Sequence, residues 1–138
     1  MRYVIFTLMV FVTAGCVQLP QTAADIQGKK FESIADKAVI YIVRPLVDGL
    51  VSAPVSLSNG MISTHQGTYY RWEVAPGTHR IEGGGVHTAA VTVQAEAGKI
   101  YFVELNADGG ARDGLTKLSL RRIDENRGRR MVSDAQAL

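Results

Sequence analysis

The feature that most constrains the fold is a period-two alternation of apolar and polar residues, which begins at Ala38 and continues in short runs to Ile123. Such alternation places successive side chains on opposite faces of a β-strand. β-Branched and aromatic residues dominate the runs, and turn signals separate them at close spacing. The sequence therefore predicts an all-β fold, an antiparallel immunoglobulin-like β-sandwich of seven or eight short strands.

Two runs are apolar enough to lie inside the sandwich. Residues 38–43 form the opening strand, which ends at Arg44-Pro45 because proline cannot donate to a β-ladder. Residues 100–105 are largely apolar on both faces and predict a central strand.

The most strand-like run is 68–74. One of its faces is predicted to join the core, and it carries Tyr70, Trp72 and Val74. The other face is predicted to be mostly in solvent, and it carries Tyr69, Arg71 and Glu73.

Two turns are marked by residues that suit positive φ. Asn59-Gly60 predicts a hairpin turn. Pro76-Gly77 has the residues favoured at the central positions of a type II turn, and the run 79–82 is expected to return as the partner strand.

The N-terminus has the layout of a secretory signal. A basic residue, Arg2, precedes an apolar stretch at 4–12, and the small residues Ala14 and Gly15 precede Cys16. The apolar stretch is shorter than the roughly 20 residues that a membrane-spanning helix requires. The boundary resembles the bacterial lipobox, which is cleaved between Gly15 and Cys16 and lipidated on the cysteine. An ordinary signal peptide, or a buried helix with an incidental cysteine, is the alternative.

Lipidation also accounts for the single cysteine of an exported chain, which has no partner for an internal disulfide. The predicted organisation is a signal peptide at 1–15, a lipidated tether at 16–36, the β-sandwich at 37–123, and a basic tail or short helix at 124–138. Val17, in place of Asp after the cysteine, favours the periplasmic face of the outer membrane by resemblance to lipoprotein sorting. No cofactor is predicted apart from the covalent lipid.

Two segments carry a resemblance to a known family. The run GTYYRWEVAPGTHRI at 67–81 and the run EAGKIYFV at 96–103 resemble bacterial lipoproteins of domain-of-unknown-function (DUF) family 2846. The resemblance covers 37–123 and implies an envelope lipoprotein with a β-sandwich and no assigned activity. It carries over no catalytic residue. The turn at 58–60 and Ala75 depart from the family pattern, but the residues present at both places are compatible with a turn.

The sequence gives little support for a metal site or for a catalytic site. His65, His79 and His87 lie on different predicted strands or edges, without the spacing of a zinc site, so no metal site is predicted. The carboxylates Asp108, Asp113 and Glu104 fall near one loop, where paired acid and base catalysis is conceivable. They support the alternative function, an envelope hydrolase or carbohydrate-active enzyme.

The candidate binding surface consists of Tyr69, Tyr101 and Arg71, an aromatic platform for an envelope protein or a glycan. A net charge of +2, which falls to +1 when Arg2 is removed, gives no basic field for a nucleic acid. The one basic run is either a solvated tail or a contact for anionic lipid, and it comprises Arg121, Arg122, Arg127, Arg129 and Arg130. We therefore expect a lipid-anchored, non-enzymatic binding or assembly module; a purely structural stabiliser of the envelope is a further possibility.

Overall fold

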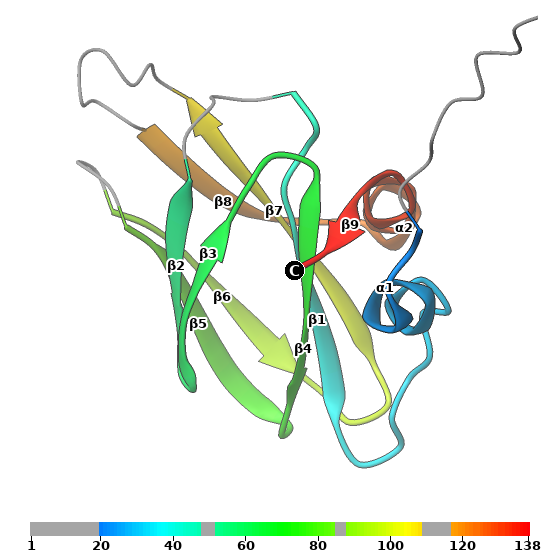
Figure 1. Cartoon of the computed structure of the whole chain (residues 1–138). Helices are drawn as coiled ribbons and strands as arrows, with labels where there is room; N and C mark the ends of the chain where they lie inside the picture. The colour runs from blue at the N-terminus through cyan, green and yellow to red at the C-terminus, as the bar shows by residue number, and fades with distance from the viewer. Residues whose placement is uncertain (1–19, 48–51, 85–87, 109–116) are drawn as a thin grey trace, which may run out of the picture.

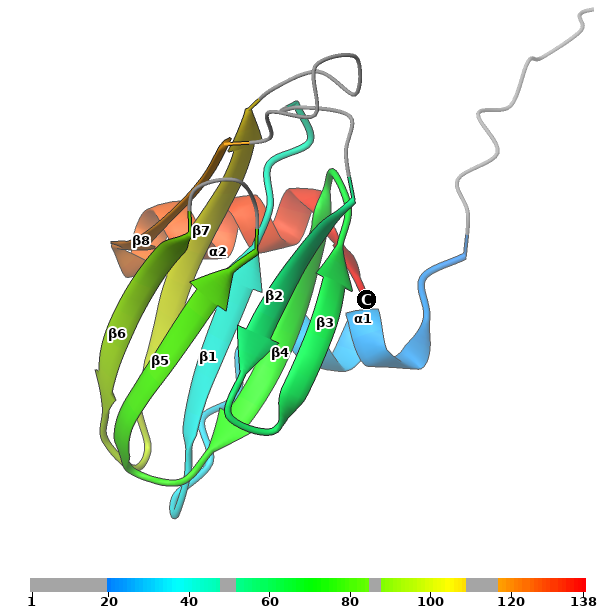
Figure 2. The same ribbon diagram turned by 90° about the vertical axis from the view of Figure 1, so that its left-hand side faces the viewer.

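The fold is an all-β sandwich with a helical layer on one side (Figures 1 and 2). The computed structural model describes residues 20–47, 52–84, 88–108 and 117–138. The predicted signal peptide and the cleavage site at Gly15 and Cys16 lie outside the described residues. In the described residues the larger sheet has the order β8 (Lys117–Ile123), β7 (Ile100–Asp108), β1 (Ala38–Val43), β4 (Thr68–Val74) and β9 (Gln136–Ala137). The smaller sheet has the order β3 (Gly60–Thr64), β2 (Ala53–Leu57), β5 (Gly77–Gly83) and β6 (Ala89–Ala95).

Most strand pairs of the described residues are antiparallel, as the sequence predicts, but two of the four pairs in the larger sheet are parallel. Strand β1 pairs in parallel with β7, and β4 pairs in parallel with β9. The predicted Asn59-Gly60 hairpin joins β2 to β3, and Gly60 has a φ of 142° that glycine adopts readily.

The core between the sheets is built around β1. All six residues of β1 are buried, and Ile40 and Ile42 face the smaller sheet together with Trp72 and Val74 from β4. From the smaller sheet, Val93 is among the residues that meet them. The predicted core face of β4 is thus confirmed, and β7 lies between β1 and β8 as a central strand.

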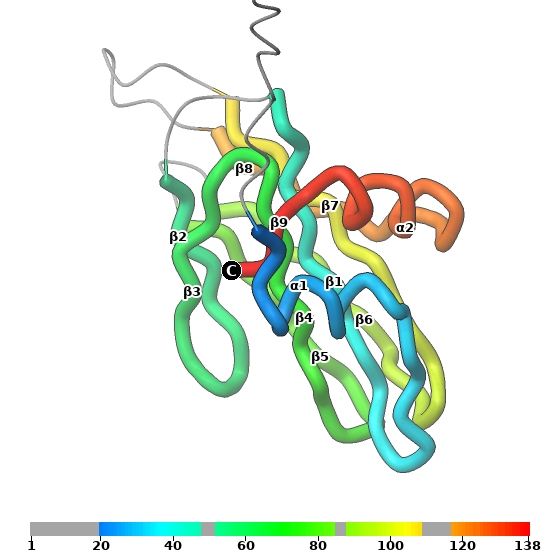
Figure 3. The backbone as a smooth tube through the Cα atoms, turned by 45° about the vertical axis from the view of Figure 1, so that its right-hand side comes forward, coloured from blue at the N-terminus to red at the C-terminus, as the bar shows by residue number. Residues whose placement is uncertain are grey.

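The opposite face of the larger sheet carries a second apolar cluster under the helices α1 (Ala23–Gly28) and α2 (Glu125–Asp134) (Figure 3). Tyr41 stacks on Phe102 with ring centroids 5.2 Å apart. Phe31 adds its ring 5.5 Å from Tyr41, and it does so from a positive φ of 52°. Tyr69 is only 1% exposed in this cluster, so the prediction that it lies in solvent is wrong. The helical layer covers it. On the same face of β4, Arg71 is half-buried and Glu73 is exposed.

The turn after β4 changes sheet. Gly77 has a positive φ of 140°, but β5 does not pair with β4 as predicted. Strand β5 instead pairs with β2 and β6 in the smaller sheet. A turn that joins the two layers therefore replaces the expected hairpin.

Segments on both sides of the predicted limits of 37–123 belong to the folded domain. Helix α1 begins after Thr22, whose side chain caps it, and its Gly28 is buried against the sheet. Helix α2 is capped by Asp124 and buries Gly128 and Val132. The predicted tether at 16–36 is therefore structured from α1 onward, and the predicted tail is a packed helix followed by β9. Neither described helix is long and apolar enough to cross a membrane.

We expect Gly128→Ala to destabilise the domain by about 1–3 kcal/mol, because a new Cβ would lie 2.6 Å from Cβ of Phe102 and overpack the cluster. This reverses the usual effect of the exchange, since alanine is favoured over glycine by about 1 kcal/mol within a helix. Urea unfolding measures the change. The exposed Asn126→Ala is the control on the same helix and should change stability by less than about 0.5 kcal/mol. An unchanged or raised stability of Gly128→Ala would show that α2 does not dock on Phe102.

Candidate functional site

The structure separates the three residues of the predicted binding surface. Tyr69 and Arg71 lie on the helical face of the larger sheet, whereas Tyr101 packs at the margin of the core between the sheets. Residues 69 and 71 on β4 share one face, and the odd-numbered positions of β7 point to the other. The predicted aromatic platform is therefore wrong.

Each of the three residues has a structural role instead. The hydroxyl of Tyr69 donates to the backbone oxygen of Asp25 at 3.1 Å. Arg71 pairs with Glu73, and its Nη2 donates to the backbone oxygen of Glu32 at 3.3 Å. The hydroxyl of Tyr101 accepts from a backbone N–H at 3.1 Å. These contacts fix loops and helix α1 onto the sheet.

Asp25 joins the two ends of the chain. Its Oδ1 accepts from the backbone N–H of Ala137 in β9 at 3.0 Å, and its Oδ2 lies 3.0 Å from Nζ of Lys29. Burial alone would raise the pKa of this carboxyl. The hydrogen bonds from Lys29, Tyr69 and Ala137 lower the pKa by more than burial raises it, so the net pKa lies below its ordinary value. The charged carboxylate is thus the form that holds α1 against β9.

Glu104, which the sequence suggests only as a candidate for acid and base catalysis, instead fixes α2 in a similar way. It is buried on β7, where Oε2 lies 2.7 Å from Nη2 of Arg121 on β8 and Oε1 lies 3.0 Å from Nη2 of Arg127 on α2. Asn106 donates to Oε1 at 3.2 Å. Burial raises the pKa of Glu104, whereas hydrogen bonds from Arg127, Asn106 and Arg121 lower it, and the net pKa lies below the ordinary 4.5.

The basic run is therefore folded rather than a solvated tail. Arg122 lies over the ring of Tyr101 at 5.2 Å, and Arg129 lies over the ring of Phe31 at 4.6 Å. Arg129 also pairs with Glu125 one turn earlier, at 2.7 Å. Four of the five arginines of the run, Arg121, Arg122, Arg127 and Arg129, thus contact other residues of the domain, and Arg130 is exposed.

The residues considered for metal or acid–base chemistry are not brought together where the structure describes them. His65 is exposed, and the His79 ring bonds the backbone oxygen of Ala75 at 2.7 Å. Asp108 is exposed at the end of β7. His87 and Asp113 lie outside the described residues. Across residues 20–47, 52–84, 88–108 and 117–138, no three His, Cys, Asp or Glu side chains are grouped as metal ligands.

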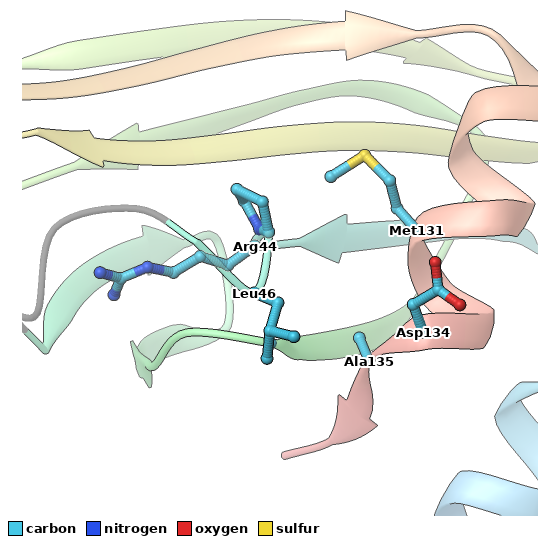
Figure 4. Close-up of a pocket in the computed structure, with 7 residues that line it drawn as sticks. Arg44, Leu46, Met131, Asp134 and Ala135 are labelled. Carbon is cyan, nitrogen blue, oxygen red and sulfur yellow. The ribbon is translucent and has the colours of Figure 1, made fainter.

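A pocket of about 470 Å³ lies where the end of β1 meets the C-terminal end of α2 (Figure 4). This volume is within the range of small-ligand sites, about 300–1,000 Å³. The lining is mostly apolar and consists of Arg44, Pro45, Leu46, Gly67, Met131, Asp134 and Ala135. Residues that follow β1, the turn before β4 and the C-terminal end of α2 thus meet at one place.

The rim of the pocket exposes apolar side chains. Leu46 is 69% exposed and the adjacent Val47 is 87% exposed, although the buried strand β1 ends only a few residues before them. Side chains of this kind beside an apolar hollow are typical of a contact surface.

Asp134 supplies the negative charge of the pocket. It lies at the C-terminal end of α2, where the helix dipole is negative and where the last turn carries no basic residue. Among the described residues it takes part in no salt bridge, although Arg130 lies one turn earlier. The guanidinium of Arg44 points away from Asp134 and donates to the backbone oxygen of Thr64 at 2.9 Å (Figure 4). The pocket therefore suits an apolar group that carries a positive charge.

The sequence contains only a weak signal for this pocket. Leu46 and Val47 are two apolar residues directly after a strand-ending proline, a place where polar turn residues are expected. Met131 and Asp134 fall in a segment whose dominant feature is its arginines. Only the fold brings the two segments together.

Comparison with known proteins gives no relative for this chain. No protein-family model matches it, and a search of curated proteins finds no significant match. The resemblance to DUF family 2846 stays a prediction.

We expect Glu104→Gln to lower the free energy of unfolding by about 1–3 kcal/mol at neutral pH, because two arginines lose a buried carboxylate partner. A carboxyl whose pKa is depressed by folding contributes stability above its unfolded-state pKa, and the contribution is lost as the pH falls through the folded-state pKa. The wild type should therefore lose stability below about pH 4.5, and the variant should lose less. Urea unfolding across this range, with the exposed Glu96→Gln as control, measures the difference. Parallel pH profiles for wild type and Glu104→Gln would contradict the assignment.

Proposed function

We propose that the protein is a lipid-anchored, non-enzymatic module of the bacterial envelope, held on the periplasmic face of the outer membrane, which binds an envelope protein through the pocket at Leu46 and Asp134. The observation that carries the binding role is the apolar pocket with its exposed apolar rim and with Asp134, a carboxylate that forms no salt bridge among the described residues. The anchor is supported by the sequence around Cys16.

The distance between the anchor and the domain is short. Thr22 caps α1, and Asp25 in that helix is fixed to β9, so six residues separate Cys16 from folded structure. An extended chain of this length spans at most about 20 Å. A lipid on Cys16 would therefore hold the domain close to the membrane surface, where partners in the same membrane are within reach.

The occupant that fits the pocket best is a lysine or arginine side chain of the partner. Its aliphatic stem matches Leu46 and Met131, and its charge matches Asp134 at the negative end of α2. A glycan is less suited, because the aromatic platform that would favour it is not assembled.

The alternative of an envelope hydrolase or carbohydrate-active enzyme requires converging catalytic groups. In the described part of the chain Glu104 is held by arginines and Asp108 is exposed elsewhere on β7, so no observation favours this alternative.

We expect the wild-type chain, expressed in a Gram-negative host, to fractionate with the outer membrane and to have the mass of residues 16–138 plus acyl groups. Cys16→Ala removes the thiol that receives the lipid, so membrane association and the added mass should both be lost. Intact mass and membrane fractionation measure these two properties, and Ser133→Ala serves as the matched control. A wild-type protein that is soluble, or that retains residues 1–15, would overturn the anchor.

We expect hexylammonium to bind the pocket more tightly than hexanol, and Asp134→Asn to weaken the ammonium about two- to fivefold, which is the range for an exposed charge pair. Chemical-shift changes of the Met131 methyl group, followed in titrations, report binding. Asp108→Asn removes an exposed carboxylate that does not line the pocket and should leave the affinity unchanged. Equal affinity for the two probes would remove the argument for a cationic occupant.

A further inference from the structure

Strand β6 forms an edge of the smaller sheet. Its full length is paired with β5, from the pair Ala95–Gly77 at one end to the pair Ala89–Gly83 at the other. In the described residues no strand pairs with its other side. The side chains on its outward face, Ala90, Thr92 and Gln94, are exposed. Strand β8 of the larger sheet lies close to β6 but forms no ladder with it. Within the part of the chain that the structure describes, the main-chain groups along the second side of β6 are therefore not paired with a strand.

The residues of β6 do not protect this edge. Its sequence, AAVTVQA, contains no charge, no proline and no glycine over seven residues. Natural sheets normally guard an edge with lysine, proline, a bulge or a very short strand, because an unguarded edge pairs with other chains.

The other edges differ from β6. Strand β8 carries Lys117, Arg121 and Arg122, and β9 has only two residues. Strand β3 is short and begins at Gly60. The longest uncharged edge is thus β6, and this contrast between edges points to a partner on that side.

The sequence of β6 is nearly symmetric about Thr92. In an antiparallel pair of two copies centred on this residue, Thr92 meets Thr92, Val91 meets Val93, and Ala89 meets Ala95. Only Ala90 and Gln94 are unlike partners. Valine pairs and threonine pairs across strands are favourable, and no like charges are brought opposite each other.

We propose that β6 pairs with β6 of a second copy of this chain, antiparallel and centred on Thr92, so that the smaller sheets of two copies become one continuous sheet. A two-fold axis through Thr92 satisfies the symmetry that most homodimers adopt. The inward positions Val91 and Val93 extend the apolar core across the junction, and the outward positions place the two Thr92 side chains in contact on the solvent face.

A single strand pair buries little surface, so the dimer is expected to be weak in dilute solution. Two copies confined to one membrane surface have a higher effective concentration, which favours the pair. This last step rests on the proposed lipid anchor, whereas the pairing itself does not.

The test uses cysteine cross-linking on the exposed face of β6. Cys16 is the only cysteine, so the full chain with Cys16→Ala and Thr92→Cys carries one thiol, and its oxidation reports on contact between copies. Residues directly opposite in an antiparallel pair have Cα atoms about 4.5–5.5 Å apart, which suits a disulfide. We expect Thr92→Cys to give about tenfold more disulfide dimer than Ala90→Cys, since two copies of residue 90 lie about 13 Å apart in this register.

A mixture of Ala90→Cys and Gln94→Cys chains should cross-link, because these positions face each other in the proposed register.

Thr92→Lys places two positive charges opposite each other and should abolish dimers in sedimentation at high protein concentration. The monomer should stay folded, since Thr92 is exposed. Equal cross-linking at positions 90 and 92, or cross-linking at an introduced Met61→Cys in β3 alone, would overturn the proposal. Loss of membrane association would overturn only the anchor, because these measurements use the Cys16→Ala background.

Discussion

Burial of both faces of β1 is the constraint on which the rest of the structure depends. Its inner face is covered by the smaller sheet, but its outer face carries Val39, Tyr41 and Val43, which a two-layer sandwich would leave in water. The cover is supplied by both ends of the chain, as α1 and α2 (Figure 2). The hydroxyl of Tyr41 donates to the backbone oxygen of Gly28 at 2.6 Å, so the aromatic face also positions α1.

Two buried carboxylates make this cover specific. Apolar packing alone would allow short helices to slide over the sheet, whereas a buried charge requires its partners in one geometry. Asp25 requires the backbone of β9, and Glu104 requires arginines from β8 and α2. The pocket follows from this arrangement. Helix α2 is fixed near its start by Glu104, so its last turn, with Asp134, is held beside Leu46.

Local sequence signals predicted the strands well and the layers poorly. The runs at 38–43, 68–74 and 100–105 and the Asn59-Gly60 hairpin depend on alternation and turn chemistry, which are properties of a few adjacent residues. Burial of Tyr69 was not predictable in this way, because its cover is a six-residue helix and an arginine-rich helix without a long apolar stripe. Nor does a Pro-Gly turn specify which sheet the next strand joins. The predicted binding surface has the same weakness, because alternation assigns a face to each strand separately, whereas the pocket forms only where separate segments meet.

The arrangement of the layers keeps the proposed surfaces apart. The chain enters α1 on the helical side of the larger sheet, whereas β6 lies at the far edge of the smaller sheet (Figure 2). A lipid attached a few residues before α1 would therefore leave the β6 edge unobstructed. The pocket belongs to the helical side, at the end of α2, which is also the side on which the chain enters α1. The proposed pairing through β6 and the proposed binding at the pocket thus do not compete for the same residues, and two domains held by the proposed lipid anchor would present two pockets toward the membrane.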